Sequence, residues 1–76
     1  MEKYLNELSP KAFGTVKKIL AEGKMKRRLY DMGVTPGVGI VVKKLAPMGD
    51  PMEITIRGYE LTIRKSEAQT IVMEVK

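Results

Sequence analysis

The clearest pattern along the chain is a strict alternation of apolar and polar residues over positions 52–57. Successive side chains of a β-strand point to opposite faces, so this alternation predicts a strand with one buried face. Gly58 and Tyr59 follow at a hairpin point, and Leu61 and Ile63 resume the alternation. The segment therefore predicts a β-hairpin.

Three further segments have the composition of strands. Gly39–Leu45 is rich in Val, and residues 71–75 carry an apolar residue at every second position. Over residues 15–21 the apolar positions alternate imperfectly, which predicts a strand with an irregularity near Lys17 and Lys18.

One segment has the periodicity of a helix. Met25, Leu29 and Met32 fall at positions i, i+4 and i+7, which share one face of a helix over residues 24–32. Gly33 follows directly, where the end of a helix favours a residue that can adopt positive φ.

Two shorter signals predict single helical turns. Ser9 and Pro10 have the form of a helix start, and Gly14 is expected to end that helix within one turn. Residues 66–69 (Ser-Glu-Ala-Gln) have the form of a capping box.

The predicted elements, in chain order, are a strand, a helix, three strands, a helical turn and a strand. Short strands of this number usually close into a small barrel, because closure removes exposed edges. We therefore predict a mainly β fold, a small SH3-like five-stranded barrel with one inserted short helix. Residues 1–76 are expected to form a single domain, because a chain of this length has no room for a second core.

The composition excludes several kinds of chemistry. The chain has no Cys and no His, so it lacks disulfides, the usual zinc ligands, the strongest nucleophile and the commonest general base. Glu53 and Glu60 are the only carboxylates that the predicted hairpin would bring close, and such pairs are more often solvated than bound to metal. We expect no enzymatic activity, no cofactor and no metal site.

The charge balance favours an acidic partner. Lys and Arg number 14 against nine Asp and Glu, which gives a net charge of +5 and a pI near 9.6. Nucleic acid, anionic lipid and an acidic protein face would all suit this balance, as would a basic surface that serves only solubility. No stretch has the apolar run of a signal peptide or a membrane-spanning helix, so we expect a cytoplasmic protein.

The densest cationic segment is the predicted helix. Four cations within five residues repel one another, and an acidic counter-surface would relieve that repulsion. They are Lys24, Lys26, Arg27 and Arg28. A solvated helix face is the alternative interpretation, as is pairing of Arg28 with Asp31 one turn later.

Two other residues are candidates for contact with a partner. Met48 lies in a loop between two prolines, where an exposed apolar side chain would lose little entropy on binding. The alternative is that Met48 folds back over the end of the barrel. Tyr59, at the predicted hairpin tip, is of the residue type that anchors interfaces.

Three stretches carry a resemblance to a known family. Residues 27–37 read RRLYDMGVTPG, residues 46–51 read APMGDP, and residues 57–68 read RGYELTIRKSEA. They resemble the RRLxxMGxxPG, APxGDP and RGYxLxLRKxEA signatures of the FeoA family of bacterial ferrous iron uptake. The match covers nearly the whole chain, with all pieces in order. Asp50, in the second stretch, joins the candidate partner-binding residues.

The resemblance implies an SH3-like barrel that associates with FeoB, the membrane ferrous-iron transporter with a cytosolic GTPase-like domain. Control of nucleotide turnover, assembly of the transporter and gating are three roles that family membership leaves open. A further hypothesis places residues 24–28 against the anionic inner face of the cell membrane, where each Lys or Arg gains about 1 kcal/mol.

The alternative function is a basic small β-barrel that binds nucleic acid. Such proteins stack bases on neighbouring aromatic side chains. The four aromatic residues, Tyr4, Phe13, Tyr30 and Tyr59, are spread along the chain. We therefore expect no specific nucleic acid partner, and the oligomeric state is left open.

Overall fold

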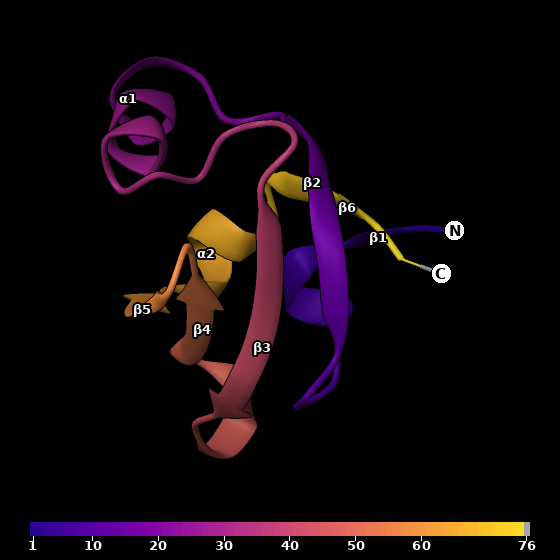
Figure 1. Cartoon of the computed structure of the whole chain (residues 1–76). Helices are drawn as coiled ribbons and strands as arrows, with labels where there is room; N and C mark the ends of the chain where they lie inside the picture. The colour runs from indigo at the N-terminus through magenta and orange to yellow at the C-terminus, as the bar shows by residue number, and fades with distance from the viewer. Residues whose placement is uncertain (76) are drawn as a thin grey trace.

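The computed structural model describes residues 1–75, which form one antiparallel β-sheet with short helical segments between its strands (Figure 1). The strand order is β1-β6-β2-β3-β4-β5, so the first and last strands of the chain lie side by side. The strands are β1 (Glu2–Tyr4), β2 (Phe13–Ile19), β3 (Gly39–Leu45), β4 (Met52–Ile56), β5 (Tyr59–Ile63) and β6 (Ile71–Glu74). The helical segments are the 3-10 turns η1 (Leu5–Glu7) and η2 (Pro47–Gly49) and the α-helices α1 (Gly23–Asp31) and α2 (Lys65–Ala68). Within residues 1–75, no helix has the length and apolar character needed to span a bilayer.

The mainly β class is confirmed, although the sheet has six strands where the pattern predicted five. The additional strand is β1. Its three residues are all exposed, so the sequence has no alternation of apolar and polar residues that would indicate a buried face there. Backbone pairing holds β1 against β6, because Met1 and Val75 exchange two N–H···O bonds of 2.7 and 2.8 Å.

The sheet does not close into the predicted barrel. Within the described residues, β1 and β5 are its two edges and do not pair with each other. The chain passes from β5 to β6 through α2, and the fully buried Ala68 of α2 covers the core there. Side-chain packing from α2 thus replaces the strand pair that closure would require.

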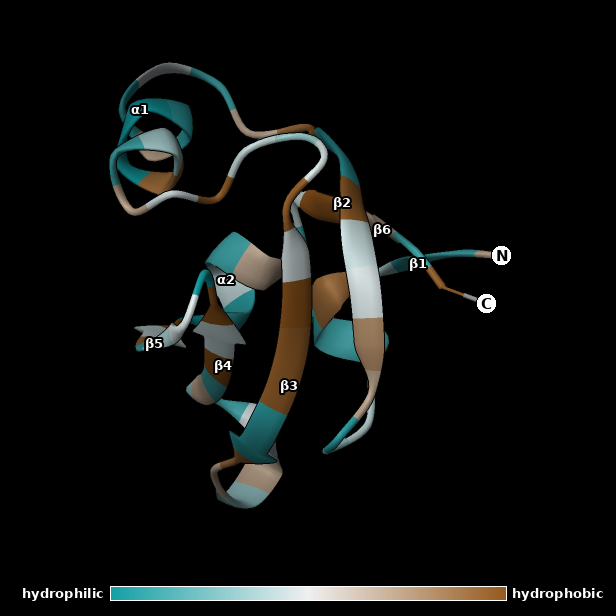
Figure 2. Ribbon diagram, in the orientation of Figure 1, coloured by the Kyte–Doolittle hydropathy of each residue, from teal (hydrophilic) through white to brown (hydrophobic). Residues whose placement is uncertain are grey.

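The hydrophobic core lies on the inner face of the sheet. Met52, Ile54 and Ile56 of β4 are all buried, as the alternation predicted. Ile40 and Val42 of β3 are fully buried opposite them. Figure 2 shows the hydrophobic middle of β3 in brown, whereas α1 is mostly hydrophilic. Each such burial contributes about 1.5–3 kcal/mol, so packing holds the fold without a disulfide.

The beginning of β2 differs from the prediction. No helix starts at Ser9; the carbonyl of Ser9 instead accepts the Ala12 N–H in a turn, at 3.0 Å. Gly14 lies inside β2, where an added Cβ would lie 3.1 Å from the Glu74 carbonyl oxygen. Close strand approach, rather than a helix end, explains this glycine. The predicted irregularity is confirmed as a register shift between Val16 and Lys18.

The end of α1 is close to the prediction and has a defined form. The Gly33 N–H donates to the Tyr30 carbonyl and the Val34 N–H to the Leu29 carbonyl, each at 2.9 Å. This pair of bonds is a Schellman motif, which needs positive φ at its central residue, and Gly33 has φ +93°. Leu29 and Val34 are fully buried, so the motif fastens the helix end to the core.

Two turns near the C-terminal half are shifted from their predicted positions. The hairpin turn is Arg57-Gly58, and Tyr59 already belongs to β5. Both turn residues have positive φ, +51° and +84°, which matches the twist of the flanking strands. α2 begins at Lys65 rather than Ser66, because the Glu67 carboxylate accepts the Arg64 N–H at 3.1 Å and caps the helix there.

Candidate partner-binding surfaces

The cations of α1 point away from the core. Leu29 is fully buried and Met25 is half-buried, which leaves the other helix positions to solvent. All four predicted cationic residues are exposed there, namely Lys24, Lys26, Arg27 and Arg28.

One of these four cations has a structural partner. The Arg28 Nε atom lies 3.5 Å from Oε2 of Glu67, whose side chain is almost fully buried. The alternative pairing with Asp31 is therefore wrong, because the carboxylate of α2 is the group within reach. Arg28 thus ties α1 to α2 and compensates a buried charge, which is costly when left alone.

The other three cations of α1 form no ion pair within residues 1–75. The ammonium of Lys26 lies 5.8 Å from the centre of the Tyr30 ring, a cation–π distance. Within residues 1–75, Lys24 and Arg27 form no ion pair with an acidic side chain. These two residues are the part of the α1 surface whose charge is available to another molecule.

Tyr59 lies beside α1, although it belongs to β5. Its hydroxyl donates a hydrogen bond to the Met32 carbonyl at the end of the helix. The polar tip of Tyr59 is thus engaged within the chain, while the residue as a whole stays 42% exposed. The side chain therefore joins the hairpin to α1 before any partner is considered.

Met48 lies in η2 and is the most exposed large apolar residue, at 95%. The structure thus decides between the two alternatives, since the side chain does not fold back over the sheet. Its φ of +71° lies in the left-handed region that few residues other than glycine adopt. Asp50 follows, and its carboxylate accepts the Lys65 N–H at 3.0 Å, which links this loop to α2.

The predicted partner-binding residues do not form one surface. α1 lies at one end of the molecule, and the η2 loop with Met48 lies at the other (Figure 1). The seven residues of β3 run between them, a span of roughly 20 Å at about 3.3 Å per residue. The structure thus groups Tyr59 with α1 and leaves Met48 on a separate surface.

The carboxylates of the hairpin are paired with lysines. Glu60 accepts a hydrogen bond from Lys43, and this contact raises the pKa of Lys43 above its ordinary range. Glu53 lies 3.7 Å from Lys44. Among residues 1–75, no group of three or more potential metal ligands comes together.

The four aromatic side chains come from four different elements. Tyr4 lies on β1, Phe13 on β2, Tyr30 on α1 and Tyr59 on β5. Single-strand binding of the stacking type requires neighbouring rings. The arrangement therefore gives no specific support to the nucleic-acid alternative.

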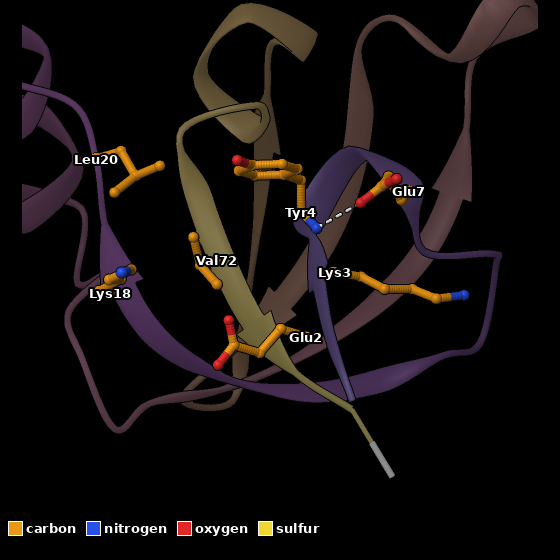
Figure 3. A pocket seen from close by; sticks show the side chains of 7 residues that line it. All are labelled: Glu2, Lys3, Tyr4, Glu7, Lys18, Leu20 and Val72. Carbon is orange, nitrogen blue, oxygen red and sulfur yellow. Dashed lines mark hydrogen bonds between the residues drawn. The ribbon is translucent and has the colours of Figure 1, made fainter.

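A groove that the sequence did not reveal lies on the outer side of β1, β6 and β2 (Figure 3). It has a volume of about 270 Å³, and its apolar lining comes from Tyr4, Leu20 and Val72. The sequence analysis did not predict β1, and it is the pairing of β1 with β6 that places Tyr4 at the groove. The groove was therefore not expected. The apolar Leu20 within the imperfect pattern of residues 15–21 was the one signal available.

Comparison with known proteins gives a consistent result. The family model described as "FeoA domain" matches residues 3–75. A curated protein of Porphyromonas gingivalis, named "Fe(2+) transport protein A/Fe(2+) transporter FeoB fusion protein", is 28% identical over 71 residues. That alignment covers 93% of this chain, while the chain spans only 8% of the length of the fusion protein.

Solved structures have the same fold. The solution structure of a FeoA-like protein from Clostridium acetobutylicum is 43% identical, with a TM-score of 0.90 over 97% of this chain and 86% of that one. The crystal structure of Stenotrophomonas maltophilia FeoA complexed with zinc, described as a procaryotic SH3 domain protein, has a TM-score of 0.80 at 24% identity. It covers 97% of this chain and 89% of that one, which supports the SH3-like fold.

Proposed function

This chain belongs to the FeoA family, and from that premise we propose that it is a non-catalytic interaction module of ferrous iron uptake that binds and modulates the FeoB transporter. The observation that carries the proposal is the fusion in Porphyromonas gingivalis, where one polypeptide is named for both components. A short covalent link raises the effective concentration of two domains for each other to the millimolar range. Without such a link, association of the two domains would need a surface with its own affinity.

The α1 face is the surface that best supplies this affinity. Lys24 and Arg27 are exposed and form no ion pair within the described residues, and the net charge of +5 adds a long-range attraction to any acidic face. We assign the partner contact to these two residues. Arg28 contributes less, because its guanidinium already compensates Glu67.

The test is binding of the chain to the purified cytosolic GTPase-like domain of the transporter from the same organism. Titration by calorimetry, with and without guanine nucleotide and across a salt series, should give saturable binding that weakens as salt screens the contact. Lys24→Glu and Arg27→Glu should each weaken binding by about tenfold, or about 1.4 kcal/mol.

Lys11→Glu is the matched control for these variants. It changes the net charge equally, but Lys11 precedes β2, at the end of that strand away from α1. Its binding should therefore stay within about twofold of wild type. Absence of saturable binding under every condition would overturn the proposed association, and equal losses in all three variants would overturn the assignment to α1.

The membrane hypothesis is part of the same proposal. The unpaired cations of α1 are expected to favour anionic headgroups by about 1 kcal/mol each. Co-sedimentation with vesicles should therefore show more protein on phosphatidylglycerol than on phosphatidylcholine at low salt. Equal partition to both vesicle types would refute the membrane contact, but it would not bear on the proposed contact with the transporter.

A further inference from the structure

The groove of Figure 3 has an apolar centre between two exposed side chains. Tyr4 and Leu20 are 43% and 49% exposed and face each other across Val72, which is 7% exposed and forms the floor. Tyr4 and Val72 are partners in the β1–β6 register. Single exposed apolar residues are common on protein surfaces, but two large ones across a hollow offer a place for a third apolar group.

The size of the groove restricts what it can hold. Its volume of about 270 Å³ is below the range of roughly 300–1,000 Å³ that is typical of small-molecule pockets. It also lies open on the face of the sheet, as Figure 3 shows. One bulky side chain of another protein fits these dimensions better than a cofactor does.

The charges around the groove favour an acidic occupant. Glu2 pairs with Lys17, which lowers the pKa of Glu2, and Glu7 accepts the Tyr4 N–H at 2.7 Å. Both carboxylates of the rim are therefore engaged within the chain. Lys18 completes the rim and forms no ion pair within residues 1–75. The side chain of Lys3 lies on the opposite face of β1 from Tyr4 and extends away from the hollow (Figure 3).

The groove is preorganised, and its edge is closed to strand addition at Tyr4. The two bonds between Met1 and Val75 define the β1–β6 ladder, and alternation along that ladder turns the Tyr4 N–H outward. The Glu7 carboxylate already occupies this N–H. A partner is thus expected to lie across the face of the groove rather than extend the sheet, and it meets side chains that are already in place.

We propose that this groove is a second docking site, separate from α1, for an acidic segment of a partner protein that inserts one aliphatic side chain between Tyr4 and Leu20. Lys18, the register partner of Val72 in β2, holds a carboxylate beside the inserted side chain. The site does not depend on the contact proposed for Lys24 and Arg27.

The test uses three capped peptides and the full chain labelled with ¹⁵N. The peptide GSDELESG carries the acidic groups and a leucine, GSNQLQSG lacks the acidic groups, and GSDEAESG lacks the leucine. Titration to about 1 mM should shift the amide signals of Tyr4, Lys18, Leu20 and Val72 with the first peptide, in a saturable way. The other two peptides should bind at least tenfold more weakly.

Variants of the chain localise the binding. Leu20→Ser and Lys18→Glu should each weaken the first peptide at least tenfold. Two controls should leave its affinity within about twofold. Phe13→Ser removes an exposed apolar residue at the start of β2, at the other end of that strand from Leu20, and Lys24→Glu makes the same change of charge as Lys18→Glu, but on α1. Equal binding of all three peptides, no shift at the groove, or an equal loss in Lys24→Glu would overturn the proposal.

Discussion

Gly33 joins α1 to the hairpin, and its replacement by alanine tests how that joint is built. Two features of the position oppose a side chain. The backbone has φ +93°, and a Cβ at this position would lie 2.6 Å from the Tyr59 hydroxyl oxygen. That hydroxyl donates to the Met32 carbonyl, so Gly33→Ala must both strain the backbone and displace the hydrogen bond.

The expected loss follows from these two contributions. A left-handed backbone costs an L-residue roughly 1–2 kcal/mol, and the displaced hydrogen bond is worth about 0.5–1.5 kcal/mol. Their sum is about 1.5–3.5 kcal/mol. A domain of this size has a free energy of unfolding of only about 4–11 kcal/mol at 0.05–0.15 kcal/mol per residue. Gly33→Ala should therefore lower the Tm by about 6 °C or more, at roughly 4–8 °C per kcal/mol for a domain of this size.

The assay is urea unfolding followed by circular dichroism, with the free energy of unfolding taken by linear extrapolation. Gly37→Ala is the matched control, because Gly37 has φ +94° but open space around the added Cβ. It should lose only the backbone contribution, about 1–2 kcal/mol. Tyr59→Phe should lose the hydrogen bond alone, about 1 kcal/mol.

The double variant separates the two contributions. Without the hydroxyl, the nearest ring atom lies 3.9 Å from the added Cβ, so Gly33→Ala should cost about 1 kcal/mol less in the Tyr59→Phe background. Strict additivity of the two substitutions, together with equal losses in Gly33→Ala and Gly37→Ala, would refute the assignment of Tyr59 as the link between hairpin and helix.

Two further predictions concern charged side chains. Arg28→Ala should lower the free energy of unfolding by about 1 kcal/mol, because it leaves the buried Glu67 carboxylate without its cation; solvent at the exposed guanidinium moderates this loss. The control Arg27→Ala, measured by the same urea assay, should change the free energy of unfolding by less than about 0.5 kcal/mol. Equal losses in the two variants would contradict the pairing of Arg28 with Glu67. Glu60 raises the pKa of Lys43, so the stabilisation from this pair is complete below the ordinary lysine pKa and is lost as the pH rises through the raised pKa. NMR titration of the Lys43 side chain should show a lower pKa for Lys43 in the Glu60→Gln variant. An unchanged pKa would show that Glu60 does not cause the shift.

The sequence predicted the elements whose side chains divide between core and solvent. Residues of β4 alternate and α1 has helical spacing, and both elements are where the pattern placed them. β1 has no buried face and depends on backbone pairing with β6, more than sixty residues away in the sequence. A local pattern carries no information about such a partner, so β1 and the groove beside it were missed.

Long-range contacts also limited how much of the candidate site could be predicted from the sequence. The sequence left open whether Met48 is exposed or folds back, and the structure decided it. The exposure of the α1 cations followed from local sequence. The partners of Arg28 and Tyr59 did not, because they lie 39 and 27 residues away in the chain. Helix spacing suggested Asp31 for Arg28, whereas the fold brings a buried carboxylate of α2 within reach of the same guanidinium.

The folding roles of the FeoA-like stretches narrow the search for partner contacts. Leu29 and Gly33 build the end of α1, Arg28 compensates a buried carboxylate of α2, and Asp50 holds the start of α2. These residues hold α1, α2 and the η2 loop in place, and each therefore has a sufficient structural reason to be present.

Arg27 and Met48 have no such reason within residues 1–75. Arg27 forms no ion pair there, and Met48 exposes 95% of its surface in a left-handed backbone that offers the fold no evident gain. A residue that costs backbone strain persists where another interaction compensates it. Arg27 belongs to α1 and Met48 to η2, and these two segments lie toward opposite ends of β3 (Figure 1). A partner that used both residues would therefore have to extend along the length of β3.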